Sequence, residues 1–238
     1  MNQETFHRLI HVVIDRLGAS APPHDLFAGG VDDWHSRARL AHFLLQMPEH
    51  RADGIALLQS TADAEVNEDL AQDVEEKVYA LQALSAAESE NPELRDAALE
   101  HINLAIECAE STDFLYKYIL RGELWADRWN LMHKMQMTAE AEQEADERIA
   151  AFDGLDADVP HNSYLYYGYR FKAHLAAERG VPLVAKDYMH MAIHAMEIPP
   201  ACEQPLADAF AAAHENAAWI LREIDRATPN PETLHWDI

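Results

Sequence analysis

Two histidine pairs have the spacing that a metal site on a helix would use. His7 and His11 are four residues apart, and so are His190 and His194. Residues four apart lie on one face of an α-helix, so each pair would present two imidazoles side by side, as zinc sites require. However, the chain contains 14 histidines and 42 acidic residues, and such pairs are expected by chance at this density. We therefore predict that the protein binds no metal.

The motifs of common catalytic sites are missing from the sequence. It contains no glycine-rich phosphate loop, no GxSxG nucleophile turn and no HExxH zinc motif. Cys108 and Cys202 lie far apart, which indicates neither a disulfide framework nor a zinc knuckle. The acidic run at 140–147 would be spread around a solvated helix surface rather than form an acid–base pair. We predict that the protein is not an enzyme and has no catalytic residues or cofactor.

The charge of the chain restricts its partners. Its 238 residues carry 18 basic and 42 acidic side chains, a formal net charge of −24, so nucleic-acid phosphates and anionic membranes should repel it. The first residues lack the basic and apolar regions of a signal peptide, and no apolar run is long enough for a membrane span. We expect a cytoplasmic protein that binds neither nucleic acid nor membranes.

The elements that must position any site are helices. Apolar residues recur every three or four positions throughout, and no segment alternates strictly as a half-buried strand would. Segments rich in Pro and Gly divide this pattern, notably 18–33, Asn91-Pro92 and Gly180-Val181-Pro182. The predicted helices are 3–18, 33–47, 50–64, 68–89, 92–110, 113–134, 138–152, 162–179, 182–197 and 203–227.

One pair of these helices carries a recognisable repeat pattern. The first helix reads Tyr164-x2-Tyr167-Gly168-x2-Phe171, and the second carries a row of small and bulky residues at Ala185, Met189 and Ala192. This pattern resembles the tetratricopeptide repeat. Weaker copies have their small residue at Ala38, Ala83 and Gly122. A small residue in the first helix is expected to let the second helix approach closely, with the aromatic residues filling the space between pairs.

The resemblance implies an all-α, right-handed solenoid of antiparallel helix pairs with capping helices at both ends. We expect a single helical-repeat domain over 1–227 followed by a tail at 228–238. Its repeats should span about 31–65, 76–110, 115–153 and 161–198, and a C-terminal helix should span 203–227.

The resemblance also implies a binding face, because the first helices of such pairs line a concave groove that holds a peptide or a partner helix. The facing positions here are Tyr116, Glu123, Asp127, Asn162, Tyr169 and Lys172, with Lys77 and Leu84 as equivalents in a weaker repeat. An acidic groove with tyrosines suits a basic or amphipathic segment. We therefore expect a non-enzymatic interaction scaffold. One alternative is an acidic inhibitor or immunity-type protein that neutralises a basic enzyme, and a second is a metal-dependent helical enzyme.

Overall fold

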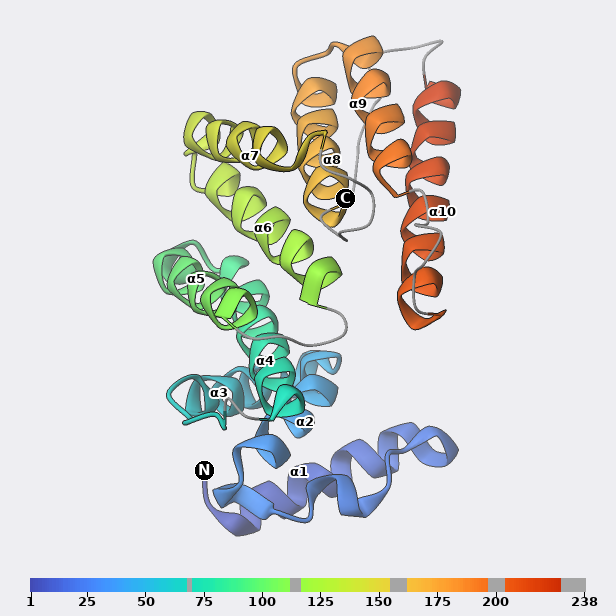
Figure 1. Cartoon of the computed structure of the whole chain (residues 1–238). Helices are drawn as coiled ribbons and strands as arrows, with labels where there is room; N and C mark the ends of the chain where they lie inside the picture. Colours follow the sequence, from blue (N-terminus) through green and yellow to red (C-terminus); the bar gives the residue numbers. More distant parts are fainter. Residues whose placement is uncertain (68–69, 112–116, 155–161, 197–203, 228–238) are drawn as a thin grey trace. The chain divides into compact units, whose positions relative to one another are not determined.

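Helices account for nearly all of the regular structure (Figure 1). The computed structural model describes residues 1–67, 70–111, 117–154, 162–196 and 204–227, and these residues include no β-strand. They contain ten α-helices, namely Gln3–Leu17 (α1), Trp34–Leu45 (α2), Arg51–Ala62 (α3), Ala71–Ser89 (α4), Arg95–Ser111 (α5), Lys117–Lys134 (α6), Thr138–Phe152 (α7), Asn162–Glu178 (α8), Pro182–Ala195 (α9) and Gln204–Ala227 (α10).

The predicted all-α class is confirmed, and each predicted segment contains one helix. The main differences lie at helix starts. A 3-10 turn, Pro92–Leu94, precedes α5, and the predicted starts at 68 and 113 fall outside the described residues. The side chains of Asn2 and Asp33 cap α1 and α2 by accepting a backbone N–H from the first turn. Within the described part, no helix is long and apolar enough to cross a membrane.

The chain separates into two compact units, Met1–Phe114 and Leu115–Ile238, within which consecutive helices pack on one another. In the first unit α2 packs on α3, α3 on α4, and α4 on α5. In the second unit α6 packs on α7 and α8, and α8 packs on α9, which contacts α10. The prediction of one domain over 1–227 stays a prediction, and the predicted tail at 228–238 lies outside the described residues.

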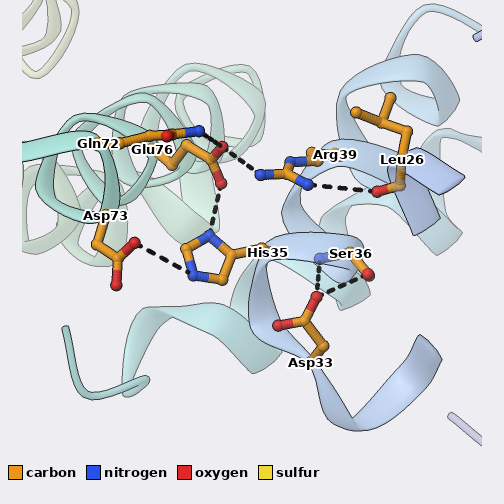
Figure 2. A network of polar contacts seen from close by, with 8 residues as sticks. All are labelled: Leu26, Asp33, His35, Ser36, Arg39, Gln72, Asp73 and Glu76. Carbon is orange, nitrogen blue, oxygen red and sulfur yellow. Dashed lines mark hydrogen bonds and ion pairs between the residues drawn. The ribbon is translucent and has the colours of Figure 1, made fainter. Parts of the chain in front are cut away.

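A polar network joins α2 to α4 in the first unit (Figure 2). The Nδ1 atom of His35 lies 2.6 Å from one carboxylate oxygen of Glu76, and Arg39 donates to the other at 2.5 Å. On its opposite side, Nε2 of His35 lies 3.6 Å from the Asp73 carboxylate. Burial by itself would raise the pKa of Glu76, but the hydrogen bonds and charges of Arg39 and His35 outweigh it and lower this pKa.

This network predicts a specific dependence of stability on pH. Glu76 has a lower pKa in the folded chain than in the unfolded chain, so its stabilising effect is present above the unfolded pKa and is lost as the pH falls through the folded pKa. In Glu76→Gln, the free energy of unfolding should therefore fall less steeply than in the wild type between about pH 5 and about pH 3. Urea denaturation at several pH values measures this slope.

Glu75→Gln is the matched control, because the neighbouring carboxyl group shifts in the opposite direction. Burial and the charge of Glu76 raise the pKa of Glu75, so its removal should leave the acid-induced loss of stability as steep as in the wild type, or make it steeper. An identical reduction of the slope in both variants would contradict the role assigned to the Glu76 network.

Lys77 is buried in the first unit, with 4% of its surface exposed. Its ammonium group donates to the backbone carbonyls of Thr61 and Ala62 at 2.6 Å each and to that of Ala64 at 3.0 Å. Thr61 and Ala62 are the last residues of α3, where helical carbonyl groups have no partner within the helix, and Ala64 follows just after it. Lys77 therefore caps α3 from α4, and its predicted place on a binding face is wrong. Leu84, its companion in that prediction, is also fully buried.

The core of the second unit is aromatic where α6 meets α8. Trp129 is fully buried, and its ring centroid lies 6.0 Å from that of Trp125 and 5.8 Å from that of Phe171. Tyr164 of α8 stacks on Phe152 of α7 at 4.4 Å. The predicted structural role of the repeat aromatics Tyr164 and Phe171 is therefore confirmed, since both are buried.

The glycines of the second unit mark close helix contacts, but not between the helices that the repeat pattern predicts. A Cβ atom on Gly122 of α6 would lie 2.7 Å from the backbone of Ser163 in α8, and one on Gly168 of α8 would lie 2.8 Å from Ile149 in α7. Neither glycine faces the following helix of its own predicted pair. The sequence pattern shows that a small residue is needed, whereas the packing decides which neighbour approaches it.

Candidate functional site

A cavity of about 300 Å³ lies among α6, α8 and α10 of the second unit. Its walls combine two carboxylates, one guanidinium, one imidazole, one phenol, two amides and two apolar side chains. The residues that line it are Glu123, Ala126, Asp127, Asn130, Tyr167, Arg170, Phe171, His174 and Asn216. A cavity of this size with several convergent polar groups is typical of a ligand site.

Helical periodicity explains why these side chains share one space. On α6 the lining residues begin at Glu123 and recur three, four and seven positions later. On α8 they begin at Tyr167 and recur at the same intervals. This spacing places each set on one face of its helix, and the two faces meet where α6 packs on α8. Asn216 contributes from α10.

The two carboxylates of the cavity, Glu123 and Asp127, disfavour ionisation of the buried phenol of Tyr167. Burial raises the pKa of Tyr167, and the nearby carboxylates of Glu123 and Asp127 raise it further because they disfavour a phenolate. Tyr167 therefore keeps its proton and can donate a hydrogen bond.

The basic side of the cavity is held in place by aromatic rings. The Arg170 guanidinium lies 5.2 Å from the centroid of the Tyr166 ring and 5.7 Å from that of Tyr167, and it donates to the Tyr166 hydroxyl at 3.2 Å. That hydroxyl in turn donates to the carbonyl of Ala213 in α10 at 3.2 Å. Two buried nitrogens of the lining residues, Nε of Arg170 and Nδ1 of His174, have no hydrogen-bond partner within the described part of the chain. Both atoms are closed off from solvent and lack the partner that buried polar groups usually have.

The structure gathers only part of the predicted binding face into this cavity. Glu123 and Asp127 line it, but Tyr169 and Lys172 do not. The ring of Tyr169 stacks on that of Tyr188 in α9, with 6.3 Å between their centroids. Lys172 pairs with Asp146 of α7, and its Nζ atom lies 5.2 Å from the centroid of the Tyr188 ring. Two further predicted residues add nothing to the cavity. Asn162 is the first residue of α8 and is partly buried, and Tyr116 lies outside the described residues.

The missed lining residues on α8 are Tyr167, Arg170 and His174. Two positions along a helix turn the side chain by about 200°, so Tyr167 and Tyr169 cannot face the same cavity. The repeat pattern assigned Tyr167 to helix packing and placed Tyr169 on the open face. A stripe of polar side chains at Tyr167, Arg170 and His174 was the signal in the sequence that could have identified the correct face.

The two histidine pairs with metal-site spacing do not line the cavity. His7 and His11 are exposed on α1, and His190 is exposed on α9. Neither pair belongs to a group of three potential metal ligands among the described residues. Cys108 is partly buried in α5, and Cys202 lies outside the described residues.

Comparison with known proteins identifies no relative. No protein-family model matches the chain, and searches of curated proteins and of solved structures found no match.

Proposed function

We propose that this chain is a tetratricopeptide-like helical-repeat protein that binds a basic or amphipathic polypeptide segment at the cavity of its second unit. The four predicted repeats correspond to the helix pairs α2–α3, α4–α5, α6–α7 and α8–α9, with α1 and α10 in the places of caps. This order of helices is the one expected for the predicted right-handed solenoid of antiparallel pairs. We further propose that the protein acts in the cytoplasm as a non-enzymatic scaffold.

The composition of the cavity carries this proposal. Glu123 and Asp127 supply negative charge for a lysine or arginine side chain, and Tyr167 adds a phenol donor together with aromatic contact area. The guanidinium of Arg170, which also lines the cavity, can donate to a carbonyl oxygen. A polypeptide offers basic side chains and backbone carbonyls in one molecule, so it matches both sides of the cavity. The net charge of −24 should speed its approach.

A fluorescein-labelled amphipathic peptide of lysine and leucine tests the proposal by fluorescence anisotropy, with a glutamate–leucine peptide as the comparison. The basic peptide should bind and the acidic one should not. Affinity should fall as salt rises from about 0.05 to about 0.5 M, because the screening length contracts from over ~10 Å to about 4 Å. In the double variant Glu123→Gln/Asp127→Asn, affinity should fall by about tenfold or more, mainly through faster dissociation.

The double variant Glu140→Gln/Glu147→Gln is the matched control, because it changes the net charge equally on an exposed part of α7. It should bind the basic peptide with nearly wild-type affinity. An equal loss in both double variants would show that only overall charge matters. Loss in Tyr169→Ala without loss in the cavity variant would instead place the site on the face of α8 that carries Tyr169.

A further inference from the structure

Three potential metal ligands converge beside the cavity, where the end of α6 meets the end of α8. They are His133 of α6 and His174 and Glu178 of α8. One ligand atom from each lies within 4.8 Å of the other two, and they form the one such group of three among the described residues. His174 and Glu178 are four residues apart and therefore share a face of α8.

The ligand atoms of this group already point toward one another. Nε2 of His133 lies 3.0 Å from one oxygen of the Glu178 carboxylate, and Nε2 of His174 lies 3.4 Å from the other. In a tetrahedral zinc site with bonds of about 2.0–2.1 Å, neighbouring ligand atoms are about 3.3 Å apart. The two nitrogen–oxygen distances, each to a different carboxylate oxygen, are close to this spacing.

His133 also has the supporting contact that metal ligands usually have. Its Nδ1 atom lies 2.8 Å from the hydroxyl of Thr138, the first residue of α7. A hydrogen bond at Nδ1 fixes the ring orientation and leaves Nε2 to act as the ligand. The side chain of Glu178 is 46% exposed, so an ion has a path from solvent.

We propose that His133, His174 and Glu178 bind a divalent transition-metal ion, with Zn²⁺ as the best match. Two imidazoles and one carboxylate suit zinc, whereas magnesium and calcium prefer oxygen ligands throughout. The fourth position is left to water or to a ligand atom of a bound molecule, because the group supplies three protein ligands. The bound ion would fasten α6 to α8 and would lie next to the cavity, since His174 contributes to both. This site does not depend on the proposed peptide binding.

Isothermal titration calorimetry of the tag-free full chain with ZnCl₂, after dialysis against a chelator, tests this proposal. One equivalent of zinc should bind, MgCl₂ should give no such signal, and the melting temperature should rise with zinc. In His133→Gln and Glu178→Gln, zinc affinity should fall by at least about 10–100-fold, the range typical even for loss of a supporting residue. Thr138→Val, which removes only the contact to Nδ1, should weaken binding by about tenfold.

His190→Gln is the control for adventitious binding, since it removes one exposed histidine of α9 and should leave zinc affinity unchanged. Cobalt(II) gives a second readout, because a four-coordinate cobalt site absorbs visible light strongly and this band should disappear in His133→Gln. Circular dichroism confirms that each variant is folded. The proposal is overturned if the wild type binds no stoichiometric zinc, or if His133→Gln and Glu178→Gln retain wild-type affinity.

Discussion

Gly122→Ala should lower the free energy of unfolding by about 2 kcal/mol, within the range of about 1–3 kcal/mol for overpacked cores. The added Cβ would lie 2.7 Å from both the carbonyl carbon and the carbonyl oxygen of Ser163, which is fully buried in the first turn of α8. Neither atom can rotate away, since both belong to the backbone of a helix. Relief of the contact therefore requires α6 and α8 to separate, which weakens the packing around Trp129.

Gly168→Ala is the matched control for this prediction. Its added Cβ would lie 2.8 Å from Cγ1 of Ile149, a side-chain atom that can shift without moving the backbone of α7. Both variants replace a helical glycine by alanine, so both gain about 1 kcal/mol of helix propensity, and this gain cancels in the comparison. Urea denaturation should show the larger loss for Gly122→Ala. An equally large loss of stability in Gly168→Ala would contradict the distinction between backbone and side-chain contacts. Gly168→Leu, in contrast, should be severely destabilising, because the leucine side chain is too large for any movement of Ile149 to accommodate.

Lys77→Met should also be strongly destabilising, by about 2–3 kcal/mol, because hydrogen bonds to charged groups contribute about 1.5–3 kcal/mol and buried carbonyls are costly to leave unpaired. Methionine keeps most of the aliphatic part of the lysine side chain. The loss of unfolding free energy therefore measures mainly the contribution of the ammonium group. That group donates to the carbonyls of Thr61 and Ala62 at the end of α3 and to that of Ala64 just after it. Burial lowers the pKa of Lys77, which shows that part of its hydrogen-bond energy is offset by desolvation.

Arg51→Met in the same unit is the comparison for Lys77→Met. Arg51 pairs with Glu90 at 2.8 Å, and the side chains are 35% and 65% exposed. Surface pairs of this kind contribute about 0–1 kcal/mol. Chemical denaturation should therefore separate the two variants clearly. Equal stability of the wild type and Lys77→Met would show that the cap on α3 is not needed.

The proposed zinc site and the proposed peptide site meet at His174, and this overlap links their tests. Zinc at Nε2 of His174 would leave the proton on Nδ1, so the imidazole would become a fixed donor beside the cavity. Peptide affinity measured with and without zinc would then report on coupling between the two sites. Each site can still fail independently, because Glu178 does not line the cavity and Glu123 does not belong to the metal group.

The helices of this protein follow from its sequence. The three- and four-residue spacing of apolar side chains, interrupted by Pro and Gly, is sufficient to predict ten helices, because both signals act over one or two turns of a single segment. The same local logic identified the need for small residues at Gly122 and Gly168. It also placed Glu123 and Asp127 together, since they lie one turn apart on α6.

The tertiary structure alone decided which faces meet. Periodicity shows which side chains share a face of one helix, but long-range packing determines what that face contacts. For this reason Tyr167 rather than Tyr169 lines the cavity, Gly168 contacts α7 rather than α9, and Lys77 is buried as a cap. The metal group is the clearest case, because His133 and Glu178 are 45 positions apart in the sequence, from 133 to 178, and meet only where α6 packs on α8.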